Sequence, residues 1–282
     1  MKNCLFISFL SFFLVSNSSV FGQDNDERKS TKSKNVSILE KEFVIKNLNA
    51  ISHKIWVYLP PNYETSKEKY PVIYMHDAQN LFDDKTSFVG EWGVDEILNE
   101  YFDKTGKGFI VVGVENGGEK RIEEYTPWKH EKYGGGKGEV YIQFLVTELK
   151  PYIDKKYRTK PQANQTAIIG SSLGGLISFY GGLQYPSTFG KIGALSTSFW
   201  FSENVIDFAK EKAKLKKTKL YLLVGEQEGG SMVPDTKKMS KLLPEFGFKK
   251  NNLKTKIVPE GKHNEVFWKS EFLEVINFLY DL

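Results

Sequence analysis

The stretch TAIIGSSLGGL, residues 166–176, holds a serine whose hydroxyl is placed to act as a nucleophile. A short apolar run ends at Gly170, two serines and a pair of glycines follow, and an apolar helical pattern then begins. The pattern Gly170-x-Ser172-x-Gly174 fits a sharp strand-to-helix turn. Its glycines let strand and helix approach, and its serine hydroxyl projects clear of the sheet edge. We therefore predict that Ser172 is the nucleophile of a covalent reaction.

A serine hydroxyl is a poor nucleophile near neutral pH, so it needs a neighbouring base to take its proton. In hydrolases built on this turn, an acidic residue and then a histidine follow the serine along the chain. Only one of the four histidines, His263, follows Ser172. It lies in a polar segment after the last predicted strand, from which a loop can bring it over the serine. His263 is the predicted general base.

A carboxylate must hold the imidazole in the correct tautomer and stabilise the imidazolium that forms. Glu226 and Glu228 both lie at the carboxyl end of a predicted strand, in the segment LYLLVGEQEGG. Glu228 is past the strand end and precedes two glycines, which give it more freedom to reach the imidazole. We favour Glu228 over Glu226, with Asp235 as the third candidate.

The oxyanion of a tetrahedral intermediate needs two hydrogen-bond donors, which backbone amides commonly supply. The amide of Leu173, the residue after the predicted nucleophile, is one expected donor. The second is expected from the loop after the strand YPVIYMHD, from Gln79 or Ala78.

Strands and helices alternate along most of the chain, which favours one α/β domain with a mostly parallel, doubly wound sheet flanked by helices. Two N-terminal segments, 42–47 and 53–60, are expected to form an antiparallel edge. The other expected strands are 70–77, 108–116, the run before Ser172, 191–199, 218–226 and 253–261. The expected helices are 93–103, one ending near Lys156 with a stripe of Tyr141, Leu145, Leu149 and Ile153, then 203–213, 235–246 and one from about 266.

The chain of 282 residues is 40% hydrophobic and 26% charged, so it can bury a full core. Its formal net charge of +4 comes from 39 basic and 35 acidic residues, a balance that does not indicate nucleic-acid binding. The histidines are scattered and no close metal-ligand spacing is evident, so we expect neither a metal nor a cofactor.

The first residues have the features of an export signal. Lys2 precedes an apolar run from Leu5 to Val15, and small residues precede a cleavage point near Gly22 and Gln23. That run is too short to span a bilayer, so no stable membrane insertion is expected after cleavage. We expect a signal peptide over 1–22, a flexible leader over 23–36 and a single domain over 37–282, in a secreted or periplasmic protein.

The chain resembles the putative-esterase family of α/β-hydrolases, which includes siderophore (enterochelin-type) esterases, feruloyl and acetyl-xylan esterases, S-formylglutathione hydrolases and mycolyl transferases. The resemblance covers nearly the whole chain after the expected leader and keeps the family's order. It rests on YPVIYMHDAQNLFD (70–83), RIEEYTPW (121–128), YIQFLVTELKPYIDKKYRT (141–159), IIGSSLGGLISFY (168–180), LSTSFWF (195–201), LVGEQEG (223–229) and GKHNEVFW (261–268).

The resemblance implies the α/β-hydrolase fold and a serine esterase site. It assigns the nucleophile to Ser172, the acid to Glu228 and the base to His263. The oxyanion loop maps onto residues 77–79, with the Gln79 amide favoured. Ala78 stands where many relatives have glycine, and an alanine would strain a position that needs a positive φ.

Aromatic and basic residues near two strand ends are candidates for substrate binding. Arg121, Tyr125 and Trp128 follow the strand that ends near residue 116, and a role in bracing that loop is an equal alternative. Trp200, with the neighbouring Phe199, is a further candidate, with core packing as its alternative.

These observations together predict an exported serine carboxylic-ester hydrolase that works through an acyl-enzyme. Its expected substrates are small-molecule or glycan-linked esters, such as carbohydrate-linked acyl or feruloyl esters or siderophore esters. An acyltransferase or a peptidase with the same three residues is the alternative among enzymes. A carbohydrate- or siderophore-binding protein with a decayed site is the alternative from another class. The sequence leaves the oligomeric state open.

Overall fold

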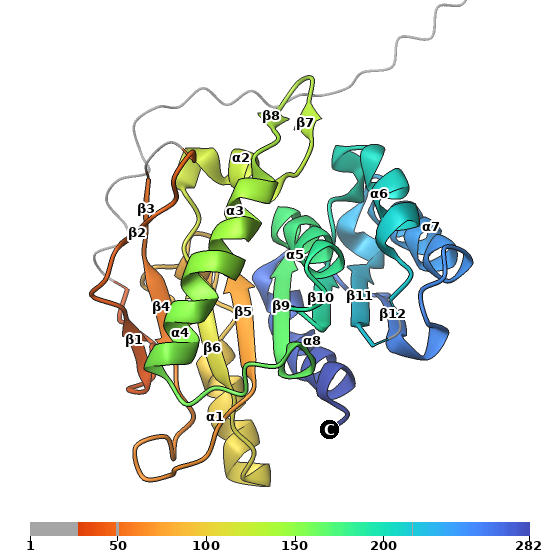
Figure 1. The fold of residues 1–282 in the computed structure, drawn as a ribbon. Coiled ribbons are helices and arrows are strands. Elements are labelled where there is room, and N and C mark those ends of the chain that lie inside the picture. The colour runs from red at the N-terminus through yellow and green to blue at the C-terminus, as the bar shows by residue number, and fades with distance from the viewer. Residues whose placement is uncertain (1–27, 49–50, 216) are drawn as a thin grey trace, which may run out of the picture.

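The computed structural model describes residues 28–48, 51–215 and 217–282, and the expected signal peptide lies outside them. Its centre is an eight-stranded sheet with the order β1-β4-β6-β5-β9-β10-β11-β12 (Figure 1). The strands are β1 (Val36–Ile38), β4 (Ile55–Tyr58), β5 (Val72–His76), β6 (Ile110–Val114), β9 (Thr166–Ser171), β10 (Lys191–Leu195), β11 (Lys219–Gly225) and β12 (Leu253–Val258). The strands from β6 to β12 in this order pair in parallel, whereas β1 and β4 pair antiparallel with their neighbours.

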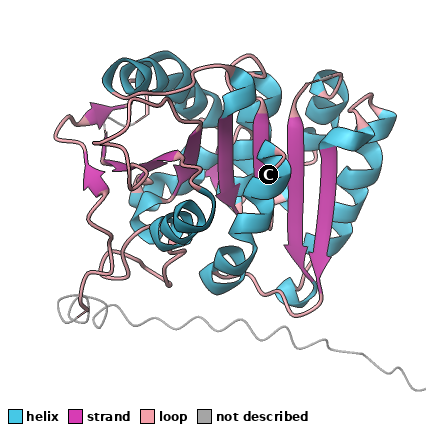
Figure 2. Cartoon of the chain, turned by 90° about the horizontal axis from the view of Figure 1, so that it is seen from below, coloured by secondary structure: helices cyan, strands magenta, loops and turns pink. Residues whose placement is uncertain are grey.

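Helices cover both faces of the sheet, as Figure 2 shows. Side chains alternate between the faces along each strand, so Val72 and Tyr74 enter one core while Ile73 and Met75 enter the other. The second core is completed by α1 (Val94–Thr105) and α8 (Glu265–Tyr280). The first is completed by α2 (Arg121–Tyr125), α3 (Gly138–Phe144), α4 (Lys150–Lys156), α5 (Leu173–Gln184), α6 (Asn204–Lys212) and α7 (Met232–Glu245). The predicted doubly wound α/β architecture is confirmed.

The predicted apolar stripe lies on a helix that changes its winding. The run from α3 to α4 is continuous through a π-helical turn at Leu145–Leu149. A strict four-residue spacing drifts around an ordinary α-helix of 3.6 residues per turn, and the wider π turn offsets that drift. Tyr141, Leu145, Leu149 and Ile153 are accordingly all fully buried.

The N-terminal strands differ from their predicted form. The segment 53–60 divides into β3 (Ser52–His53) and β4, and β3 pairs antiparallel with β2 (Phe43–Val44) in a separate small sheet. The edge of the main sheet is instead β1, whose first residue belongs to the predicted leader. A three-residue strand is too short to produce a recognisable alternation of apolar and polar residues in the sequence.

Residues 28–35 also contact the domain, although they were expected to be flexible. Ser30 Oγ donates to Asp83 Oδ2 at 2.7 Å, and the Ser33 amide donates to Asp95 Oδ2 at 2.8 Å. Asp83 and Asp95 are buried, so this segment supplies donors that their carboxylates need.

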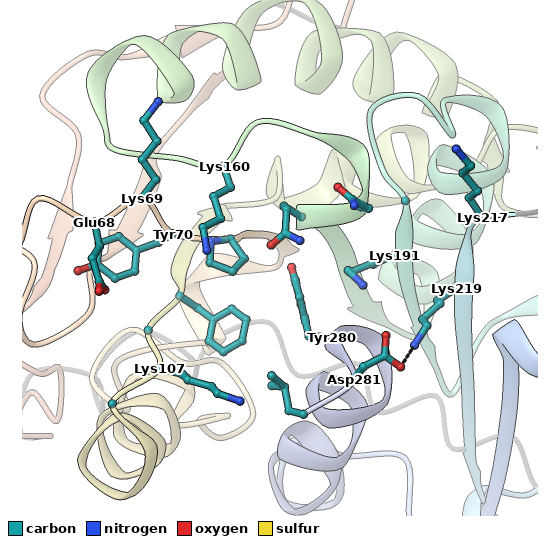
Figure 3. Close-up of a pocket in the computed structure, with 18 residues that line it drawn as sticks. Glu68, Lys69, Tyr70, Lys107, Lys160, Lys191, Lys217, Lys219, Tyr280 and Asp281 are labelled. Atoms are coloured by element: carbon teal, nitrogen blue, oxygen red, sulfur yellow. Dashed lines mark hydrogen bonds and ion pairs between the residues drawn. The ribbon is translucent and has the colours of Figure 1, made fainter.

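The sheet has two chemically different ends. At the amino ends of the parallel strands, a pocket of about 580 Å³ is lined by lysines, among them Lys191 at the start of β10 and Lys219 at the start of β11 (Figure 3). The Lys191 ammonium donates to the Leu279 carbonyl and Lys219 to that of Phe278, which places both cations at the C-terminus of α8. At the carboxyl ends of the strands lies the cavity described next. Among the described residues, none of the helices is both long and apolar enough to cross a membrane.

Candidate active site

Ser172 occupies a strained turn between β9 and α5. Its φ of 58° and ψ of −122° lie outside the regions that a side chain ordinarily permits, and its amide donates to the Leu195 carbonyl at 2.9 Å. A Cβ at Gly170 would lie 2.6 Å from the Gly174 carbonyl oxygen. The glycine of the motif is therefore required by the close approach of strand and helix.

Glu228 and His263 are joined by a hydrogen bond of 2.9 Å between Glu228 Oε2 and His263 Nδ1. Glu228 lies in the short 3-10 turn η7 (Glu226–Glu228) that follows β11, and its side chain is fully buried. Its other oxygen, Oε1, accepts from the Gly225 amide at 2.7 Å and from Ser196 Oγ at 2.6 Å. Both carboxylate oxygens are thus committed, one of them to the imidazole.

The two other carboxylates that the sequence left open lie elsewhere. Glu226 is exposed, and Asp235 accepts a hydrogen bond from Ser231 at 2.7 Å. Among the described residues, Glu228 is the carboxylate that forms a hydrogen bond with the His263 ring.

Ser172 and His263 line the same cavity of about 820 Å³. The Ser172 hydroxyl lies 3.4 Å from Ser198 Oγ, and the described residues show no hydrogen bond between Ser172 and His263. Hydrogen bonds between a nucleophile and its base are often long or poorly aligned before a substrate binds, so this geometry is compatible with a catalytic pair.

Two backbone amides were predicted to hold the oxyanion. Leu173 is the first residue of α5, where N–H groups have no acceptor within the helix. Gln79 lies in the 3-10 turn η2 (Ala78–Asn80) directly after β5 and lines the cavity, whereas Leu173 follows the cavity residue Ser172 in the chain. The positive φ in this loop belongs to Asp77, at 57°, and not to Ala78, so an alanine at position 78 causes no backbone strain.

Asp77 is held by a bidentate ion pair. Arg121 Nε lies 2.7 Å from Oδ1 and Nη2 lies 2.8 Å from Oδ2, while Asn116 donates to Oδ1 at 2.6 Å. Burial alone would raise the pKa of Asp77, but the Arg121 charge and these hydrogen bonds outweigh burial and hold the pKa below its usual value. The Asp77 carboxylate therefore stays charged beside the cavity.

The four residues predicted to bind substrate occupy different places. Arg121 lines the cavity, although its guanidinium is already paired with Asp77. Tyr125 is fully buried and accepts from the Asp77 amide at 3.1 Å. Trp128 packs against Tyr180 and Phe208, and Trp200 lines a separate, smaller cavity. Tyr125 and Trp128 thus pack within the surrounding structure, Trp200 is exposed, and none of the three lines the cavity with Ser172.

The apolar side of the cavity comes from residues that the sequence did not single out. Phe88, Val89 and Trp92 belong to the segment between β5 and α1, and Trp268 is in the first turn of α8. Phe88 and Val89 are 79% and 61% exposed, which is unusual for such side chains and marks the cavity mouth. A cluster of apolar residues in a predicted loop was the available signal for them.

A neutral histidine lies at the inner side of the same cavity. Burial lowers the pKa of His76 to about 3, so its ring carries no charge. Its Nδ1 is 2.8 Å from the Tyr141 hydroxyl, whereas Nε2 is buried without a hydrogen-bond partner in the described part of the chain. The sequence did not distinguish His76 from an ordinary strand residue.

Comparison with known proteins places this chain in a family. The family model described as "Putative esterase" matches residues 50–279. The uncharacterized protein YbbA of Bacillus subtilis is 27% identical over 242 residues, which are 81% of this chain and 93% of that protein. The endo-1,4-beta-xylanase/feruloyl esterase of Xylanibacter ruminicola is 30% identical over 159 residues, 54% of this chain but 20% of that larger protein.

A solved structure shares the fold. The siderophore hydrolase EstA of Aspergillus nidulans superposes with a TM-score of 0.71 at 17% identity, over 94% of this chain and 98% of that one. Because the family model spans most of the chain, the protein belongs to the putative-esterase family and is a carboxylic-ester hydrolase.

Proposed function

We propose that the protein is an exported serine esterase in which Ser172, His263 and Glu228 act as nucleophile, base and acid. The observation that carries this proposal is the 2.9 Å hydrogen bond between Glu228 and His263 at the cavity that also receives Ser172. The strained turn at Ser172 supports it, because such a turn holds a serine hydroxyl in the open.

The first half of the reaction forms an acyl-enzyme. With His263 Nδ1 engaged by Glu228, Nε2 is the ring nitrogen that remains to take the Ser172 proton as the side chain turns from Ser198 toward the imidazole. Ser172 Oγ attacks the ester carbonyl, and the resulting oxyanion accepts hydrogen bonds from the Leu173 and Gln79 amides. Each such donor contributes on the order of 3 kcal/mol of transition-state stabilisation. The imidazolium then protonates the leaving alcohol.

The second half returns the enzyme to its starting state. A water molecule gives a proton to His263 and attacks the acyl carbonyl, a second oxyanion forms between the same amides, and the carboxylic acid leaves as Ser172 recovers its proton. The buried Glu228 carboxylate stabilises the imidazolium in both halves.

The cavity favours an ester with an aromatic or otherwise apolar acyl group. Phe88, Val89, Trp92 and Trp268 offer apolar contact area on one side of Ser172. The similar proteins include a feruloyl esterase, whose name denotes an aromatic acyl substrate. We therefore propose aromatic acyl esters, such as those carried on a sugar, as the substrate class, with siderophore esters as the second candidate because a siderophore hydrolase shares the fold.

The direct test is covalent labelling by a fluorophosphonate probe, which reacts with activated serines. Wild-type protein is expected to be labelled and to hydrolyse a chromogenic aryl ester, and Ser172→Ala is expected to lose both properties with unchanged circular dichroism. Ser171→Ala changes the neighbouring serine of the same turn and is the matched control, which should still be labelled. Labelling of Ser172→Ala, or hydrolysis by it at the wild-type rate, would contradict the assignment.

Two further measurements address the alternatives. Adding an alcohol together with the ester shows whether the acyl group goes to water or to the alcohol, and predominant transfer would indicate an acyltransferase. Fractionation of cells that produce the full chain tests export, because a processed form outside the cytoplasm is expected if residues 1–22 are a signal peptide.

A further inference from the structure

Three carboxylates converge at the start of α1, away from Ser172. Glu91, Asp95 and Glu96 each present one oxygen, and these oxygens lie within 4.8 Å of one another. Asp95 is fully buried, Glu91 is half-buried and Glu96 is exposed. The cluster therefore has a buried base and an opening to solvent.

Oxygens of two of these carboxylates are buried without a hydrogen-bond partner. Asp95 Oδ1 and Glu91 Oε1 have none among the described residues. The other oxygen of each is used, since Asp95 Oδ2 accepts from the Ser33 amide at 2.8 Å and Glu91 Oε2 accepts from Thr31 Oγ1 at 2.9 Å. A buried carboxylate oxygen without a partner lowers the stability of the folded state, so a hydrogen-bond donor or a cation at these two atoms would be stabilising.

The charge of the cluster is suited to a divalent ion. Once ionised, the three carboxylates carry three negative charges, and Lys269 supplies one positive charge near Glu91, whose pKa is raised by burial. The sum leaves about two negative charges, which a divalent cation neutralises. Without a cation, burial and then the charge of Asp95 raise the pKa of Glu96 to about 7, so a bound proton is the competing means of neutralisation.

We propose that Glu91, Asp95 and Glu96 bind a divalent cation, and that Ca²⁺ is the ion they suit best. All three ligands are carboxylate oxygens, which hard cations prefer, and Ca²⁺ accepts irregular arrangements of six to eight oxygens more readily than Mg²⁺ does. Water can fill the remaining positions on the side where Glu96 is exposed. The sequence expectation of no metal did not consider the carboxylates at 91, 95 and 96, because their spacing resembles an ordinary acidic helix start.

An ion bound by this cluster would stabilise two segments of the chain, the one between β5 and α1 and the N-terminal one. Glu91 directly precedes Trp92, whose ring packs 5.8 Å from the Trp268 ring at the cavity wall. Thr31 and Ser33, from the N-terminal segment, bind the same carboxylates that would hold the ion. A cation here would fix the wall segment between β5 and α1 and tie the N-terminal segment to it.

Isothermal titration of chelator-treated full-length protein with CaCl₂ tests the proposal, with MgCl₂ and MnCl₂ as parallel titrants. We expect one Ca²⁺ per chain and a rise of about 5 °C in Tm at saturation. Asp95→Asn should abolish both signals, and Glu96→Gln, which alters only an exposed ligand, should weaken binding at least tenfold. Asp103→Asn is the matched control, because Asp103 is an exposed carboxylate of the same helix outside the cluster.

The proposal is overturned if folded wild-type protein shows neither binding heat nor a Tm shift with any of the three ions. It is equally overturned if Glu96→Gln and Asp95→Asn, each folded by circular dichroism, respond to Ca²⁺ as wild type does. If Asp95→Asn does not fold, Glu96→Gln alone decides. None of these readouts depends on Ser172, so a failure here leaves the esterase assignment untouched.

Discussion

At the scale of single residues, Ser196 forms hydrogen bonds with two other side chains of the candidate site. Its hydroxyl donates to Glu228 Oε1 at 2.6 Å and accepts from the Trp268 indole at 2.7 Å. Trp268 in turn packs edge-on against the His263 ring at 5.1 Å. One buried hydroxyl therefore orients both the carboxylate that binds the imidazole and the ring that supports it.

This arrangement predicts that Ser196→Ala lowers kcat for an aryl ester by about tenfold or more with little change in KM, because a hydrogen bond to a charged group is worth about 1.5–3 kcal/mol. Ser196 has a φ of 45°, so backbone strain must be separated from the loss of the hydroxyl. Ser196→Gly removes the hydroxyl and relaxes the strain. Equal losses in both variants would assign the effect to the hydroxyl, and wild-type kcat in either one would refute it.

Order along the chain was enough to propose Ser172 and His263, which stay predictions, whereas the pairing of side chains could not be predicted from the sequence. Ser172 was proposed from its glycines and His263 from being the one histidine downstream, and both line the same cavity. Arg121 was expected to face a substrate, yet it is already paired with Asp77, which lies 44 positions earlier. No local pattern reports an ion pair between two separate strand-to-helix loops.

At the scale of elements, the C-terminus of α8 is stabilised by lysines that begin two strands (Figure 3). Burial, followed by the charge of Lys219, lowers the pKa of Lys191 from 10.5 to about 8. The folded protein therefore binds fewer protons at Lys191 than the unfolded chain does between these two values. Stability from this group must rise with pH across that window and level off above it.

Lys191→Met removes this titration and leaves the rest of the pocket in place. We expect the free energy of unfolding of wild type, relative to the variant, to increase between about pH 8 and pH 10, because the neutral amine can still donate to Leu279 without a buried charge. Urea denaturation of both proteins across this range measures the difference. A constant difference over the whole range would show that Lys191 does not titrate as described.

Among the elements, those with a long apolar pattern were predictable and those defined by few residues were not. The parallel strands other than β12 are almost continuously buried, and the positions of all of them agree with the predicted ones within a few residues. The edge strand β1 has three residues, of which only Val36 is buried. The π turn between α3 and α4 could not be foreseen, because a four-residue stripe suits an ordinary helix almost as well.

At the scale of the whole molecule, the segment before β1 connects to the chain between β5 and α1, at the end of the sheet where the candidate site lies. Thr31 and Ser33 donate to Glu91 and Asp95 at the start of α1, and Ser30 and Thr31 donate to Asp83 after β5. The same stretch of chain that follows β5 provides Phe88, Val89 and Trp92 to the cavity. Residues 30, 31 and 33, which the composition assigned to a flexible leader, thus form hydrogen bonds with the segment that lines the cavity.

A chain that begins at residue 34 should therefore be less stable than one that begins at residue 28, although both retain β1. Removal of the segment leaves the buried carboxylates of Asp83 and Asp95 without donors that they use in the intact protein. Each lost partner costs about 1–3 kcal/mol, and water that enters after truncation reduces the total, so we expect a loss of about 2 kcal/mol.

Chemical denaturation of the two chains measures this loss, and the chain from residue 28 is compared with the full chain as the control. The KM for an aryl ester should also rise in the shorter chain, because the segment carrying Phe88 and Trp92 loses its support. Equal stability of the chains that begin at 28 and 34 would mean that the hydrogen bonds of residues 28–33 do not contribute to stability. In that case α1 and α8 alone would hold the segment between β5 and α1 in place.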